Sequence, residues 1–150
     1  MKISTRGFSL IEMLVVVGII GILSSVILTA LGPARDKAKD SRIIQQMNQA
    51  RALAETVYNG TYDALPNLPA LGEIGDSNLQ ALVDDIVLQG GELVIVKNSE
   101  KNATSYIMYS RLNQMLGSEP DLQTQYYCLE SGGKSAFVTE EPMSMTCTGN

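Results

Sequence analysis

The N-terminal third of the chain contains a long apolar run, followed by a periodic mixture of apolar and polar residues. From Phe8 to Leu31 there are 24 residues, and Glu12 is the only charged one. A helix rises about 1.5 Å per residue, so this run spans about 36 Å and can cross a hydrocarbon core of roughly 30 Å. The pattern predicts a membrane helix over residues 8–32.

After this run, Gly32-Pro33 marks the membrane exit and predicts a kink or a brief break in the helix. Helical periodicity then resumes and extends to about Asn59. Apolar residues at spacings of four and three form one stripe that we expect to pack on a globular domain: Ile43, Met47, Ala50, Ala54 and Val57. The polar residues mostly off this stripe predict a solvated or subunit-facing surface: Asp36, Lys37, Lys39, Asp40, Arg42, Gln45, Gln46 and Gln49.

Residues 61–150 have the pattern of a small mixed domain. A loop rich in proline and glycine over 61–75 precedes a predicted short helix over 77–89, capped by Asp76 or Ser77 and closed by Gly90-Gly91. Segments rich in Val, Ile and Tyr predict two hairpins with strands over 92–97, 104–112, 125–129 and 135–139, separated by a loop over 113–122. The expected fold class is α+β, with a long N-terminal helix packed on a small antiparallel sheet.

Composition argues against catalysis and nucleic-acid binding. The net charge is −5, which offers no basic surface for nucleic acid, and the chain has no histidine, the commonest general base and transition-metal ligand. The adjacent carboxylates Asp84-Asp85 are interpreted as solvated surface because sequence neighbours point apart. Acidic residues that could supply oxygens to calcium match no known loop spacing, so we expect neither a metal nor another cofactor: Glu119, Asp121, Glu140 and Glu141.

Two cysteines, Cys128 and Cys147, lie near the C-terminus. An even pair beyond a membrane segment predicts a disulfide formed in an oxidising compartment; the alternative is two buried free thiols in a reducing one. Basic residues flank the apolar run on both sides, so the positive-inside rule alone does not orient the chain.

The first residues resemble a known signal. A short basic leader that ends in Gly7, followed by Phe8-Ser-Leu-Ile-Glu12 and an apolar helix, resembles the class III signal of bacterial type IV pilins and pseudopilins. The resemblance implies cleavage by a prepilin peptidase between Gly7 and Phe8, N-methylation of Phe8, and an assembly role for Glu12. An ordinary secretory signal fits less well, because here the apolar run is long and follows the small residue.

This resemblance, together with the cysteines, places the N-terminus in the cytoplasm. The chain would then comprise a leader (1–7), an apolar helix for the membrane and the filament core (8–32), an amphipathic helical half (33–60) and a globular domain (61–150). A lone carboxylate in a membrane segment costs about 2.5 to 3.5 kcal/mol on insertion scales, so Glu12 needs a partner. The new amine of Phe8, from a neighbouring subunit or from the same chain, would supply it.

The expected function is that of a structural subunit of a type IV pilus. It would be stored in the inner membrane and then assembled by the pilus machinery into a helical homo-oligomeric filament outside the cell. The first alternative is a pseudopilin of a type II secretion or DNA-uptake system, located in the periplasm. A second alternative, from a different class, is a membrane-tethered binding module that never polymerises and keeps Met1 as its N-terminus.

Overall fold

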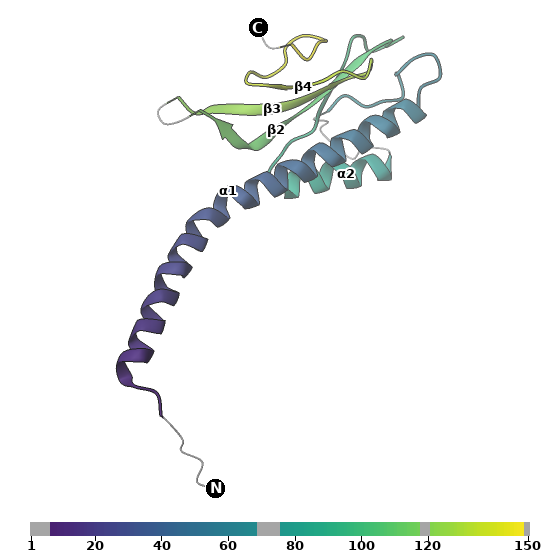
Figure 1. Cartoon of the computed structure of the whole chain (residues 1–150). Helices are drawn as coiled ribbons and strands as arrows, with labels where there is room; N and C mark the ends of the chain where they lie inside the picture. Colours follow the sequence, from purple (N-terminus) through teal and green to yellow (C-terminus); the bar gives the residue numbers. More distant parts are fainter. Residues whose placement is uncertain (1–6, 69–75, 118–120, 149–150) are drawn as a thin grey trace. The chain divides into compact units, whose positions relative to one another are not determined.

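The computed structural model describes residues 7–68, 76–117 and 121–148. The chain divides into two compact units, the first ending at Arg35 and the second beginning at Asp36. One helix, α1 (Leu10–Thr56), contributes its first half to the first unit and its second half to the second. The expected α+β architecture, a long N-terminal helix with a small antiparallel sheet, is confirmed (Figure 1).

The helix α1 continues through Pro33, so the brief break is wrong, and the kink, which was the other alternative, stays a prediction. A proline inside a helix removes one backbone hydrogen bond and leaves those of the other turns intact. The flanking residues are good helix formers such as Leu31, Ala34 and Arg35, and they continue the helix on both sides. The helix ends at Thr56, three residues before the expected end at Asn59.

The second unit contains a second helix and one four-stranded sheet. Helix α2 (Ser77–Leu88) precedes the strands β1 (Val94–Lys97), β2 (Tyr106–Leu116), β3 (Gln123–Glu130) and β4 (Ser135–Val138). The strands are antiparallel neighbours in the order β1-β2-β3-β4, which confirms both predicted hairpins. The edges of the sheet are therefore β1 and β4.

The predicted apolar stripe of α1 lies in the main core. Ile43, Met47, Ala50 and Ala54 are at most 1% exposed, and Val57 is half-buried. The first four pack with apolar residues of α2 and with the side chains on one face of the sheet: Leu79, Ile86, Ile95, Tyr106, Met108, Leu112, Tyr127 and Leu129. Burial of a large apolar side chain contributes about 1.5 to 3 kcal/mol, so this stripe fixes the C-terminal half of α1 to the sheet.

Asp40 corrects the prediction of a solvated polar surface on α1. Its side chain is buried, and its carboxylate accepts hydrogen bonds from the backbone nitrogen of Asn113 at 2.6 Å, the Asn113 amide at 2.9 Å and the backbone nitrogen of Gln114 at 2.9 Å. These donors lie more than 70 residues after Asp40, so no local sequence pattern predicts the hydrogen bonds. Asp40 therefore joins α1 to β2.

Strand β2 is longer than predicted. Residues 113–116, which we expected to belong to a loop, continue β2 after a shift in its register with β3 between Arg111 and Met115. Such an irregularity leaves backbone groups without partners on the neighbouring strand. The Asp40 carboxylate accepts hydrogen bonds from two of these unpaired N–H groups, those of Asn113 and Gln114, and so allows the strand to continue.

Helix α2 begins as predicted at an Asp76 cap, whose carboxylate accepts hydrogen bonds from the backbone nitrogens of Asn78 and Leu79. It is held beside α1 by Asp85, whose carboxylate binds Arg42 through two contacts of 2.8 Å and accepts a hydrogen bond from Gln46 at 2.7 Å. The hydrogen bond from Arg42 is the main cause that lowers the pKa of Asp85. Asp85 is thus an anchor between the helices and not merely the solvated residue that we expected.

The connection from α2 to β1 is tight. Gly90 adopts a φ of +89°, in the left-handed region that glycine tolerates. At Gly91 a Cβ atom would come within 3.0 Å of side-chain atoms of Ile43 and Ile86 and within 2.7 Å of the Ser110 hydroxyl. The predicted Gly90-Gly91 stop therefore also lets α2, α1 and the sheet approach one another closely.

Asp63 fixes the segment between α1 and α2 to the turn between β1 and β2. Its carboxylate accepts hydrogen bonds from the backbone nitrogens of Ala103 at 2.8 Å and Asn102 at 2.9 Å. These two N–H donors, with Ala103 the stronger, lower the pKa of Asp63 below its ordinary value of 3.8. Asn102 has a φ of 57°, as expected for a turn residue.

Candidate functional site

Two side chains, those of Ser9 and Glu12, cap the start of α1. The Ser9 hydroxyl accepts a hydrogen bond from the backbone nitrogen of Ile11 at 3.3 Å, and the Glu12 carboxylate accepts one from the backbone nitrogen of Ser9 at 2.8 Å. A Ser three residues before a Glu is the sequence signature of the capping box, in which two side chains satisfy the free N–H groups of a helix end. The predicted role of Glu12 rested on its charge alone, and this local role in the cap was not predicted.

The Gly7-Phe8 bond lies just outside this cap. Gly7, Phe8 and Ser9 are not helical, and α1 begins at Leu10. A bond in such a segment is free of the helical hydrogen-bond ladder and is accessible to a protease. A Cβ atom added to Gly7 would meet nothing within 4 Å, so the chain's own fold does not require glycine at this position.

Glu12 has no ion pair among the described residues, and the Ser9 N–H is its hydrogen-bond donor. The carboxylate is therefore bound by a neutral donor while its charge stays unmatched. Phe8 immediately precedes Ser9, so an α-amine created at Phe8 would lie next to the donor that Glu12 already binds. The geometry brings the three predicted residues Gly7, Phe8 and Glu12 into one short segment around the start of α1.

The first half of α1 is uncovered. Its most apolar window of 18 residues has no buried residue, and by length and composition this helix can span a membrane. All large apolar side chains from Phe8 to Leu31 are exposed, with fractions from 40% for Leu31 to 82% for Leu10. An apolar surface of this extent on a water-soluble monomer would be an interaction site. It requires lipid or other apolar helices around it.

Two hydroxyl groups within this apolar half are hydrogen-bonded to the helix itself. The Ser25 hydroxyl donates to the Ile22 carbonyl at 2.8 Å, and the Thr29 hydroxyl donates to the Val26 carbonyl at 2.9 Å. The helix is unbroken at Gly18 and Gly21, where a Cβ atom would meet nothing within 4 Å. The two glycines therefore leave the backbone open to close approach by another helix, as small residues do in membrane helix pairs.

The N-terminal segment was compared with known families. Residues 3–28 match the family model described as the prokaryotic N-terminal methylation motif. This motif is the class III signal of type IV pilins and pseudopilins. The N-terminal segment therefore carries the processing motif that such precursors have. No curated protein and no solved structure matched the chain.

The motif has two direct consequences for a chain that carries it. It implies processing by a prepilin peptidase and handling by a pilus assembly system. Together with the exposed apolar helix, it also fits anchoring in the membrane before assembly. The family match ends at residue 28, so the second unit is described from its structure alone.

The two cysteines form the predicted disulfide. Cys128 on β3 and Cys147 in the C-terminal segment are bonded, with their Cα atoms 5.5 Å apart, and both are at most 5% exposed. The Glu130 carboxylate accepts a hydrogen bond from the backbone nitrogen of Cys147 at 2.7 Å. The C-terminal segment is therefore fixed to β3 on the sheet face opposite the main core, where Ile107 and Tyr109 pack against the disulfide.

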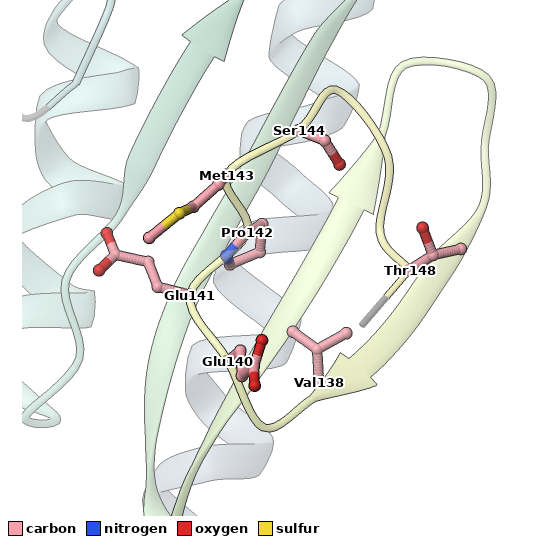
Figure 2. A pocket seen from close by; sticks show the side chains of 7 residues that line it. All are labelled: Val138, Glu140, Glu141, Pro142, Met143, Ser144 and Thr148. Carbon is pink, nitrogen blue, oxygen red and sulfur yellow. The ribbon is translucent and has the colours of Figure 1, made fainter. Parts of the chain in front are cut away.

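A hollow of about 390 Å³ lies between β4 and the C-terminal segment. Figure 2 shows Glu140 and Glu141 beside it with their carboxylates directed apart. The Glu141 carboxylate accepts a hydrogen bond from the Tyr109 hydroxyl at 2.7 Å, and Glu119 lies outside the described residues. Among residues that are described, no three acidic or cysteine side chains gather as a metal site would require.

Proposed function

We propose that the mature chain is a non-catalytic structural subunit of a type IV pilus, which polymerises into a helical filament through the first half of α1. The observation that carries the proposal is the combination of a methylation motif over residues 3–28 with an apolar helix that is uncovered along its length. A membrane anchor alone would use the helix but not the processing signal.

The proposed mechanism begins with the precursor in the membrane. Cleavage after Gly7 and methylation of Phe8 prepare the N-terminus, and extraction of the subunit moves the apolar half of α1 from lipid into a bundle of identical helices. Lipid tails are as apolar as leucine side chains, so this transfer gains little from the hydrophobic effect. Packing between helices and the matching of charge must provide the selectivity.

Glu12 supplies that selectivity in the proposed mechanism. In lipid its unmatched carboxylate costs about 2.5 to 3.5 kcal/mol on insertion scales. In the bundle, the positively charged amine of Phe8 from a neighbouring subunit pairs with it and removes much of that cost. A partner amine within the same chain would give no preference for the polymer, so the proposal requires the pair to form between subunits.

The disulfide-bonded C-terminal segment supports assignment to a pilus over a pseudopilus, because this arrangement resembles that of pilins. The assignment is tested by immunogold labelling of intact cells that make the protein, with an antibody against the second unit. We expect labelled fibres outside the cells. Labelled polymer that appears only after the outer membrane is permeabilised would favour a periplasmic pseudopilus. Membrane labelling without any polymer would contradict both assignments.

A further inference from the structure

The outer face of α2 carries an exposed apolar patch at its C-terminal end. Val87 is 56% exposed and Leu88 is 79% exposed, although Ile86 beside them is fully buried. Asp84 lies three and four residues before them, so its exposed carboxylate is on the same helical face. We call Asp84, Val87 and Leu88 the α2 patch.

A groove of about 230 Å³ lies elsewhere on the same unit, between α1 and the sheet. Its apolar wall consists of Ile44, Leu112 and the ring of Phe137, which is 56% exposed on the edge strand β4. Lys37 and Gln125 line it as well, and we call these five residues the β4 groove.

The charge at the β4 groove is available to a partner. Asp40 also lines the groove, but both of its oxygens accept hydrogen bonds from β2. Lys37, by contrast, has no ion pair among the described residues. The groove therefore has an exposed ammonium group, not held in an ion pair, beside an apolar hollow, although the buried Asp40 carboxylate also lines it. The α2 patch presents an exposed carboxylate beside two apolar side chains.

The two surfaces lie on opposite sides of the unit. Helix α2 is held against the side of α1 that carries Arg42 and Gln46. Ile44 follows Arg42 by two residues, which places it about 200° further round the helix. Along the chain, α2 is followed by the edge strand β1, whereas Phe137 belongs to the other edge strand, β4. The α2 patch of a molecule therefore cannot fill its own β4 groove.

We infer that the α2 patch of one subunit docks into the β4 groove of the next, with Leu88 against Phe137 and Asp84 beside Lys37. Contact between two different surfaces of identical chains is heterologous, and when it does not close into a ring it generates a helical filament. The inference rests on the proposed function, since it specifies how the globular units meet within the polymer. Apolar and charge complementarity both select a second copy of this chain as the partner.

Cysteine cross-linking within assembled filaments tests the contact. The variant with both Leu88→Cys and Phe137→Cys is treated with a short bismaleimide after the native disulfide has formed. We expect a ladder of dimers, trimers and longer species in denaturing gels. Each single variant should remain monomeric, because a heterologous contact never brings two copies of one position together. Leu88→Cys combined with Met143→Cys is the matched control, since Met143 is 99% exposed and lies outside the groove.

Charge exchange provides a second measurement in case the cysteines weaken the contact. Asp84→Lys alone and Lys37→Asp alone should each lower filament yield by up to about fivefold, as expected for a rim charge pair, and the double exchange should restore it. Filaments that form normally without the ladder and without this rescue would overturn the inference and leave the proposed function intact. Dimers from Leu88→Cys alone would also overturn it. Absence of filaments from the wild-type chain would instead contradict the proposed function.

Discussion

The substitution Asp40→Ala tests how α1 is joined to the sheet. It removes the buried carboxylate that accepts hydrogen bonds from the backbone nitrogens of Asn113 and Gln114 and from the Asn113 amide. The Asn113 amide keeps its second acceptor, the Gln89 carbonyl at 2.9 Å. The two backbone N–H groups lose the acceptor that they have in the described part of the chain.

The expected loss of stability follows from the two backbone N–H groups that are left without an acceptor. A buried donor without an acceptor costs about 1 to 3 kcal/mol, so two donors set a range of about 2 to 6 kcal/mol. Asp40 lines the β4 groove, where water can enter and replace part of the lost bonding, and this favours the lower half of the range. We expect a decrease in the free energy of unfolding of about 2 to 4 kcal/mol. Asp40→Asn keeps one acceptor oxygen and should fall between this variant and the wild type.

The measurement is denaturant unfolding of the full chain in mild detergent, followed by near-ultraviolet circular dichroism of the buried tyrosines. A lower midpoint with an unchanged slope would show a loss of stability alone. Asp36→Ala is the control, because Asp36 is one turn earlier, half-buried and without an ion pair among the described residues, and should change stability by less than about 0.5 kcal/mol. An Asp40→Ala variant that matches Asp36→Ala in stability would refute the reasoning.

Three further predictions concern other parts of the chain. Replacing Cys128 and Cys147 together by serine should lower the free energy of unfolding by about 3 kcal/mol in the chain-entropy model, measured by the same denaturant titration; an unchanged midpoint would contradict it. Glu12→Gln keeps an acceptor for the Ser9 N–H but removes the charge, so it should leave membrane insertion intact and lower the yield of sheared filaments; a normal yield would exclude charge matching. Because the pKa of Asp63 is lowered in the folded state, its stabilising effect is present above its ordinary value of 3.8 and is lost as the pH falls through the folded-state pKa. Asp63→Asn should therefore weaken the fall in thermal stability below about pH 4, and a melting curve with the same acid dependence as the wild type would count against this role.

Periodic apolar patterns predicted the elements of this fold well, because they report burial along one face of one element. The stripe from Ile43 to Ala54 and the α2 face with Leu79 and Ile86 both lie in the core. The cap at Asp76 was also predictable, because its hydrogen bonds reach only two and three residues along the chain.

The predictions that were wrong involve interactions between residues far apart in the sequence. Asp40 sits among charged residues and has the local pattern of a surface position, but its donors follow it by 73 and 74 residues. The extension of β2 beyond Leu112 depends on those same bonds, so the two errors have one cause. Asp85 was taken for a solvated residue because its partner Arg42 lies 43 residues before it.

At the candidate site, cleavage of the Gly7-Phe8 bond and the assembly role of Glu12 stay predictions from the sequence, and the cap was not predicted. Ser9 and Glu12 have the spacing of a capping box, and this signal could have been found from the sequence. The α2 patch and the β4 groove could not have been found in this way. Leu88 and Phe137 are apolar residues in predicted elements, and only the fold shows that both are exposed, on opposite sides of one unit.

Mass spectrometry of the intact protein from its native membrane tests the central claim most directly. The account predicts a chain that begins at Phe8 and carries a methyl group on its α-amine. Gly7→Leu is the matched control, since the fold leaves open space at this position and only the peptidase should reject the larger side chain. A wild-type protein that still begins at Met1, or that begins at Phe8 without the methyl group, would contradict the account.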